Sequence, residues 1–314
     1  MARRRNRGRS INGIFLLDKP QGLTSNQALQ RVKNLFDANK AGHTGALDPL
    51  ATGVLPICLG EATKFSQFLL DSDKHYLSTF TLGVTTETGD SEGDVVVEHD
   101  AGAVTLAKIE AAIEGFRGEI QQVPSMYSAL KHKGQPLYKL ARQGIEVERE
   151  ARTITVFDFQ ILDFRPGQQA CLDVQVHVSK GTYVRSLAED LGRVLGCGGH
   201  VSALRRNIAG PFAESETMTL RDLQTLAEAS EPADLDYLLK PMDVSVADRM
   251  AVELTATVAT YFQLGQPVMS TQAFRHGQEG DIVRVFREGG AFLGVATVTE
   301  DGRIAPKRLV VEAD

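Results

Sequence analysis

The chain has 314 residues, a hydrophobic content of 42% and a formal net charge of −6. This length exceeds that of one average domain, so we expect one large domain and one smaller domain. The three cysteines lack the spacing of a zinc site or a disulfide framework, which predicts reduced thiols, a cytoplasmic location and no bound metal. Neither a signal segment nor an apolar stretch of membrane-spanning length is evident, so we expect a soluble protein.

The first predicted elements lie between residues 11 and 123. Residues 11–17 alternate loosely and predict a strand, and Thr24 or Ser25 is a candidate cap for a helix that continues to about residue 36. The elements expected after it are a buried strand at 54–59, a helix at 61–70, a strand at 76–83, a polar loop at 85–94, a helix at 105–116 and a strand at 119–123.

The second half begins with residues 124–152, a polar stretch with two tyrosines, several basic residues and no clean periodicity, which is typical of a functional insert loop. Because strands flank helices without a regular βαβ repeat, we expect an α+β fold with a mixed, mainly antiparallel sheet. The elements expected after the insert are strands at 153–164 and 171–179, a helix from 182 to 195, one or two helices within 214–250, and short strands of a small β-barrel at 281–286, 292–298 and 307–311.

The charge is polarised along the chain. Five arginines fall within residues 1–10, a basic amino-terminal arm, whereas acidic residues concentrate between 214 and 253. A negative sum argues weakly against a nucleic-acid partner, but a basic face still suits a phosphate backbone. Taken singly, each basic cluster is equally well explained as a solvated surface. Two further clusters are formed by Lys131, His132, Lys133, Lys139 and Arg142, and by Arg205 and Arg206.

Residues 42–61 hold a single aspartate, Asp48, among glycines, small residues and apolar residues. Glycines permit backbone conformations that other residues avoid, and Pro49 disfavours a helical conformation for the residue before it. Asp48 therefore lies on a shaped loop, where binding and catalytic residues concentrate. A plain Asp-Pro turn is the alternative, but this loop is long and its neighbours are strongly apolar.

The stretch GHTGALDPLATGVLPICLGEATKF, residues 42–65, closely resembles the catalytic segment of the bacterial tRNA pseudouridine synthase family called TruB. Residues 264–309 resemble the PUA-like tail of that family, and the resemblance extends from about Gly13 to Val310. It implies a pseudouridine synthase domain at 11–250 with an RNA-gripping insert at 124–152, followed by a PUA-like RNA-binding domain at 251–314. The arginine arm at 1–10 lies outside the pattern.

The resemblance implies isomerisation of uridine to pseudouridine at position 55 in the TΨC loop of tRNA. The target base is stacked within the RNA, so such an enzyme flips it out before the chemistry. By this resemblance Asp48 is the nucleophile and Arg185 its ion-pair partner. Tyr76 stacks on the flipped base and accepts or relays a proton, so these three residues are the expected catalytic set.

The same resemblance assigns substrate contacts. His43 wedges into the RNA loop, Tyr183 packs in the uridine pocket beside Tyr76, and Leu204 lines the place of the uracil. Three of the assigned residues have ordinary structural explanations, because turn histidines such as His43, strand tyrosines such as Tyr76 and surface helix arginines such as Arg185 are common. Two lysines that match family positions, Lys19 and Lys64, are also expected to contact substrate or support the pocket.

Three functions remain open on the sequence. The first is a stand-alone tRNA isomerase that is monomeric, needs no cofactor and requires no protein partner. The second is a guide-RNA-dependent relative, which the insert at 124–152 disfavours. The third is a non-catalytic tRNA-binding or folding protein on the same scaffold, which the presence of Asp48, Tyr76 and Arg185 disfavours.

Overall fold

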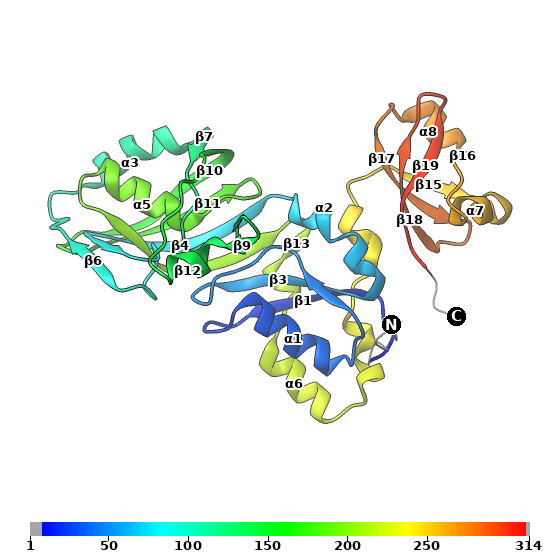
Figure 1. Ribbon diagram of the computed structural model, residues 1–314, viewed down its shortest axis with the longest axis horizontal. Coiled ribbons are helices and arrows are strands. Elements are labelled where there is room, and N and C mark those ends of the chain that lie inside the picture. The colour runs from blue at the N-terminus through cyan, green and yellow to red at the C-terminus, as the bar shows by residue number, and fades with distance from the viewer. Residues whose placement is uncertain (1–7, 312–314) are drawn as a thin grey trace.

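A ten-stranded sheet forms the larger part of the computed structural model, which describes residues 8–311 (Figure 1). Its strands are β1 (Gly13–Lys19), β2 (Ala41–His43), β3 (Thr52–Leu59), β4 (Lys74–Leu82), β7 (Gly118–Gln122), β10 (Arg152–Arg165), β11 (Ala170–Val178), β12 (Gly199–Ala209), β13 (Phe212–Ala213) and β14 (Met218–Thr219). The main order is β14-β1-β3-β12-β4-β11-β10-β7. The β1–β14 and β3–β12 pairs are parallel, whereas the long β4–β11 and β10–β11 pairs are antiparallel, which confirms the predicted mixed sheet.

Helices and 3₁₀ turns connect the strands of this sheet. Those of the larger part are α1 (Ser25–Leu35), α2 (Ser66–Leu70), α3 (Leu106–Ile113), α4 (Leu137–Ala141), α5 (Val184–Val194) and α6 (Leu220–Glu228), with 3₁₀ turns η1 (Gly60–Lys64), η2 (Glu114–Phe116), η3 (Glu214–Glu216), η4 (Pro232–Leu238) and η5 (Met242–Val246). Thr24, one of the two predicted caps, caps α1, and the structure adds a reciprocal capping box with Gln27. The single helix expected at 61–70 is divided, because η1 ends at Lys64 and α2 starts at Ser66.

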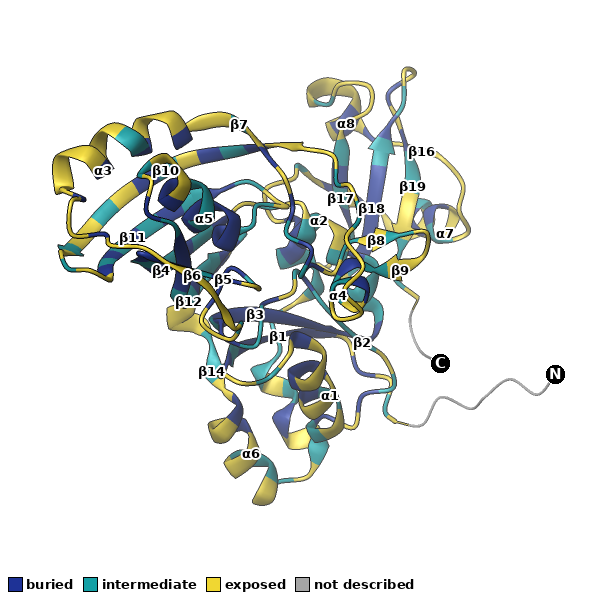
Figure 2. Cartoon of the chain, turned by 60° about the vertical axis from the view of Figure 1, so that its left-hand side comes forward, coloured by how far each residue is buried: buried dark blue, intermediate teal, exposed yellow. Residues whose placement is uncertain are grey.

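The burial of the strands shows which faces of the sheet are covered. Buried and half-exposed residues alternate along β4 and β11, so one face packs against helices and the other remains open. By contrast, β3 is buried at nearly every position, and Figure 2 shows it as a continuous buried strand. Its two faces pack into different clusters, one with Leu55 and Ile57 beside α1, the other with Val54 and Cys58 beside Phe212.

The strand β12 was absent from the elements expected on the sequence. It runs between β3 and β4 and so joins the two halves of the sheet. Its residues carry Ser202, Arg205, Arg206 and Asn207, which hide the apolar alternation typical of a central strand. Tertiary contacts explain the presence of Arg206, because it is only 1% exposed and bonds to backbone carbonyls.

The predicted small β-barrel is a curled five-stranded half-barrel, which fits the expected PUA-like fold. Its elements are β15 (Ala251–Leu254), α7 (Ala256–Gln263), β16 (Val268–Met269), α8 (Thr271–His276), β17 (Ile282–Arg287), β18 (Phe292–Val298) and β19 (Arg303–Leu309). The helices α7 and α8 were not expected, and both contribute to the separate core of the half-barrel through Ala259, Phe262 and Ala273.

The half-barrel contacts the larger part through α2, η1 and η5. The rings of Phe65 and Phe292 lie 5.2 Å apart in a shared apolar cluster. Lys64 Nζ donates to the Leu309 carbonyl at 2.9 Å, and the Val311 amide donates to a Glu61 carboxylate oxygen at 2.7 Å. The segment at η1 and the end of β19, which are far apart in the sequence, are thereby held together.

The insert at 124–152 is more ordered than its sequence indicates. It contains a hairpin of β8 (Lys131–His132) and β9 (Gln135–Pro136), followed by α4, and it has its own cluster of Met126, Leu137 and Leu140. A second small hairpin, formed by β5 (Val84–Thr86) and β6 (Val95–Glu98), holds the polar loop that lies before the insert in the sequence. Both hairpins lie outside the large sheet.

The arginine arm falls largely outside the described residues, which begin at Gly8. Its last arginine is within them, and Arg9 Nη1 donates to Asp236 Oδ1 at 3.1 Å. None of the helices between residues 8 and 311 has the length and apolar content needed to cross a membrane.

We expect Gly53→Ala to destabilise the sheet where β3 meets β12. Gly53 has φ +100°, and a Cβ there would lie 2.2 Å from the Arg206 carbonyl oxygen. A positive φ costs a non-glycine residue about 1–3 kcal/mol, and the clash adds to this. Gly118→Ala is the matched control, because Gly118 also has a positive φ but open space at its Cβ. Urea unfolding should show a clearly larger loss for Gly53→Ala, and equal losses would contradict the close approach.

Candidate active site

Two buried side chains hold the loop that carries Asp48. Ser25, the first residue of α1, accepts from the Leu47 amide at 2.7 Å and donates to the Leu47 carbonyl at 3.0 Å. Lys19 is fully buried and donates to the Ala51 carbonyl at 2.7 Å. The loop is therefore fixed on both sides of Asp48 by side chains from β1 and α1, which is the support that a reactive group requires.

Arg206 is a third brace for this loop. Its Nε donates to the Val54 carbonyl at 2.8 Å and its Nη2 to the Gly45 carbonyl at 3.1 Å. The sequence suggested that Arg205 and Arg206 meet phosphates, and for Arg206 this is wrong, because its side chain is buried inside the protein. Arg205 is half-buried and already paired with Asp18 and Glu214.

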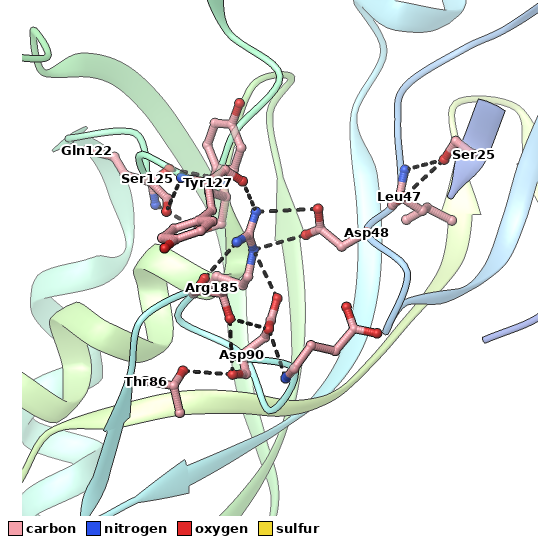
Figure 3. A network of polar contacts seen from close by, with 12 residues as sticks. Ser25, Leu47, Asp48, Thr86, Asp90, Gln122, Ser125, Tyr127 and Arg185 are labelled. Atoms are coloured by element: carbon pink, nitrogen blue, oxygen red, sulfur yellow. Dashed lines mark hydrogen bonds and ion pairs between the residues drawn. The ribbon is translucent and has the colours of Figure 1, made fainter. Parts of the chain in front are cut away.

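Arg185 lies in the first turn of α5 and faces Asp48 (Figure 3). Its Nε is 2.9 Å from Asp48 Oδ2, and its Nη2 is 3.3 Å from Oδ1, so the guanidinium approaches the carboxylate with two nitrogens. Its remaining donors reach the carbonyls of Thr88 and Tyr127 at 2.6 and 3.0 Å. The Arg185 side chain is 4% exposed, whereas that of Asp48 is 39% exposed.

The sequence did not single out Asp90, which is a second carboxylate beside Arg185. Its Oδ2 lies 3.7 Å from Arg185 Nε, and its side chain is 5% exposed. Thr88 Oγ1 and the Glu92 amide donate to its Oδ1, so the carboxylate is held within its own loop. The signal in the sequence was the glycine-punctuated polar loop at 85–94, which was noted only as a loop.

The groups around the site have opposing effects on the pKa of Asp48. Burial raises the pKa of Asp48 above its ordinary value, and Asp90 adds to this rise, while Arg185 and Lys19 act against it. Burial lowers the pKa of Lys19 to about 8, and the nearby Asp48 limits this decrease. A carboxylate whose pKa is raised by its surroundings depends on its cation to remain ionised at neutral pH.

A cavity of about 290 Å³ opens beside Asp48 and Arg185. Tyr76 and Leu204 line it from the neighbouring strands β4 and β12, where Tyr76 pairs in register with Arg206 and Leu204 with Ser78. Tyr183, the residue that precedes α5, completes the wall, and its peptide exchanges two hydrogen bonds with the Gln122 side chain. The sheet thus brings five of the residues expected at the site around one space.

A wider groove of about 1010 Å³ adjoins this cavity and shares Asp48 and Arg185 with it. His43 lines this groove, and burial lowers its pKa, which favours the neutral ring. The insert forms the opposite wall through Tyr127, Tyr138 and Arg142. His43 therefore lies at the approach to the cavity.

The two expected substrate lysines lie elsewhere. Lys19 is completely buried behind the Asp48 loop, and Lys64 bonds to Glu61 and to the half-barrel. Neither lines the cavity or the groove. In the part of the chain that the structure describes, no group of three or more metal-ligating side chains is positioned to hold an ion.

The arrangement suits covalent chemistry on a flat, uncharged ring. A carboxylate at the mouth of the cavity is available as a nucleophile, and a fixed guanidinium stabilises its charge. A tyrosine on the wall offers an aromatic face and a hydroxyl. The groove outside is large enough for the chain to which that ring is attached.

Family models match most of the chain. Residues 33–184 match the amino-terminal domain of the TruB family pseudouridylate synthases, residues 185–247 a tRNA pseudouridylate synthase B carboxyl-terminal domain, and residues 251–310 the carboxyl-terminal segment of pseudouridine synthase II TruB. The tRNA pseudouridine synthase B of Saccharophagus degradans is 56% identical over 313 residues and covers 100% of both chains. That of Yersinia pestis strain Pestoides F is 53% identical over 321 residues, 100% of this chain and 96% of its own. The chain belongs to the TruB family of pseudouridylate synthases.

Solved structures agree with this TruB assignment. The archaeal box H/ACA sRNP Nop10-Cbf5 complex contains a chain similar at a TM-score of 0.69 and 25% identity, over 95% of this chain and 85% of its own. A Cbf5-Nop10-Gar1 complex contains one similar at a TM-score of 0.69 and 27% identity, over 96% of this chain and 84% of its own. The resemblance noted in residues 42–65 is confirmed, together with the pseudouridine synthase fold.

We expect Arg185→Met to raise the pKa of Asp48 further, because the substitution removes the nearest cation and leaves the carboxyl group in the same surroundings. Arg185→Lys keeps a charge without the two-pronged geometry and should give an intermediate pKa. The carbon NMR shift of the Asp48 carboxyl, followed against pH in the three proteins, measures the effect. The same titration midpoint in Arg185→Met and in the unsubstituted protein would show that Arg185 does not control the charge.

Proposed function

We propose that this TruB protein converts uridine to pseudouridine at position 55 in the TΨC loop of tRNA, with Asp48 as the nucleophile. The observation that carries the proposal is the two-nitrogen contact of the buried Arg185 with Asp48 at the mouth of a cavity lined by Tyr76. The relatives that are 53–56% identical over 96–100% of their lengths are named tRNA pseudouridine synthase B, which supports tRNA as the substrate.

The reaction breaks the N1–C1′ bond of the nucleotide and forms a C5–C1′ bond, while one proton leaves C5 and one is added at N1. It is an isomerisation without net oxidation, and we propose that no cofactor takes part. Asp48 acts while ionised, so Arg185 supports the step by opposing the effect of burial on its charge. Tyr76 provides the face on which the base stacks, a contact worth about 1–3 kcal/mol, and a hydroxyl for the proton at C5.

A stacked base must leave the RNA before it reaches this cavity. We assign Tyr183 and Leu204 to the walls that hold the base, and His43 to the groove, where it fills the space left in the RNA loop. The insert at 124–152 grips the RNA from the other side of the groove through Tyr138 and Arg142. For Lys19 we propose a supporting role behind the loop, in agreement with its bonds to backbone carbonyls.

We further propose the domain division at 11–250 and 251–314, in which the half-barrel adds an RNA-binding surface and Lys64 supports its junction with the catalytic part. The protein acts in the cytoplasm as a monomer without a guide RNA or an obligatory partner. A guide-dependent mode is the alternative, since the similar chains were solved in complexes with Nop10, one of them named an archaeal box H/ACA sRNP. Pure protein incubated with unmodified tRNA transcript distinguishes the two, because only a stand-alone enzyme forms pseudouridine there.

We expect Asp48→Asn to abolish pseudouridine formation while tRNA affinity stays within about tenfold, because RNA affinity depends chiefly on phosphate contacts. The amide has nearly the same shape but is not a nucleophile of comparable strength. Single-turnover conversion and filter binding of the same tRNA measure the two effects. Activity near that of the unsubstituted protein, in a preparation free of host enzyme, would refute the role of Asp48.

A further inference from the structure

The short helix α2 lies between the half-barrel and the strands of the large sheet (Figure 1). On one side, Phe68 packs into the apolar cluster that Phe65 and Phe292 form across the junction. On the other side, Leu70 lines the cavity itself. One helix of five residues thus contacts both parts of the protein.

Lys74 closes the carboxyl end of this helix. It is the first residue of β4 and is 6% exposed. Its Nζ donates to the carbonyls of Leu69 at 3.1 Å, Leu70 at 2.8 Å and Ser72. The last carbonyls of a helix lack partners within the helix, and a cation near them also interacts favourably with the helix dipole.

The position of Lys74 connects this cap to the site. Residues two apart in a strand point to the same face, so Lys74 and Tyr76 face the same way, and both line the cavity. The ammonium group has three protons, and three backbone carbonyls accept from it. Lys74 consequently has no donor left for substrate, and its effect on the reaction must pass through the groups that it holds.

We propose that Lys74 is a positioning residue that joins α2 to the wall of the active-site cavity, so that the half-barrel supports the chemical step as well as RNA binding. The inference rests on the proposed isomerase function and extends it to a region outside the catalytic residues. The path runs from Phe292 to Phe65 and Phe68, through α2 to Lys74, and along β4 to Tyr76. It requires no contact between the half-barrel and the flipped base.

The first test compares Lys74→Met with Lys74→Arg. Methionine keeps most of the stem and removes all donors, whereas arginine keeps the charge and several donors. Since small displacements of reacting groups are costly, we expect the single-turnover rate of Lys74→Met to fall about tenfold or more, with tRNA affinity within about threefold. Lys74→Arg should recover part of the rate. An unchanged rate in a folded Lys74→Met protein overturns the proposal.

The second test uses Phe292→Ala and a short TΨC stem-loop RNA. Loss of the junction contact should lower the single-turnover rate at saturating RNA, whereas the matched truncation Leu264→Ala, at a residue of the half-barrel that is 71% exposed, should leave it unchanged. If both residues act through α2, the double variant Lys74→Met with Phe292→Ala loses no more than the slower single variant. The proposed link between the half-barrel and the cavity is overturned if the rate losses of the two single variants multiply in the double variant. It is also overturned if Phe292→Ala changes only the affinity for RNA.

Thermal melting curves show whether a variant loses activity because the protein unfolds or because groups of the active site are displaced. Should Lys74→Met not fold, Lys74→Arg replaces it in the double variant, and the same comparison decides. The unsubstituted protein is the control for the function itself. If it leaves uridine unchanged in both RNAs, the proposed function fails, and this inference fails with it. If it converts uridine and the variants match its rate, only the inference fails.

Discussion

The site depends on keeping a carboxylate charged in surroundings that favour its neutral form. Burial raises the pKa of Asp48, and the guanidinium of Arg185 opposes that rise at 2.9 Å. Arg185 is itself almost fully buried, so its charge needs more than one partner, and Asp90 with the carbonyls of Thr88 and Tyr127 supplies them. A buried guanidinium such as that of Arg185 is stable only when its other donors are also satisfied. The loop at 85–94 and the start of the insert therefore belong to the site as much as the catalytic loop does.

The same requirement explains where the site lies in the sheet. The half built on β1 and β3 carries the Asp48 loop, and the half built on β4 and β11 carries Tyr76 and leads into the turn before α5. β12 joins the halves and contributes both Leu204 and the brace Arg206 to the lining of the cavity. Because Gly53 lets β3 approach β12 closely, Arg206 reaches the loop carbonyls from within the sheet. Arginine, serine and lysine side chains here do structural work that an apolar core alone does not provide, since the loop exposes backbone carbonyls and amides that need partners.

Two additions surround this catalytic centre. The insert closes one side of the groove and accepts a hydrogen bond from Arg185 at the Tyr127 carbonyl, so the segment proposed to grip RNA directly contacts the residue that pairs with Asp48. The half-barrel has its own core and meets the larger part through a compact apolar junction at Phe65 and Phe292. Both are attached near residues that shape the cavity.

The sequence by itself determined the family, the α+β class and the shaped loop around Asp48, because these depend on a local motif and on hydrophobic periodicity. It also predicted Asp48, Tyr76 and Arg185 as the catalytic set, and the structure brings these three residues around one cavity. The sequence also supplied Thr24 as a candidate cap of α1 and predicted the alternating strand β11, which are local patterns as well. Only the tertiary structure decided that β12 is a central strand, that Asp90 supports Arg185, and that Lys19, Lys64 and Arg206 bond to protein groups. The physical reason is the same in each case. A charged or polar side chain carries no signal in the sequence that says whether its partner is water, RNA or a backbone carbonyl distant in the chain, and only the folded sheet brings that partner within hydrogen-bond distance.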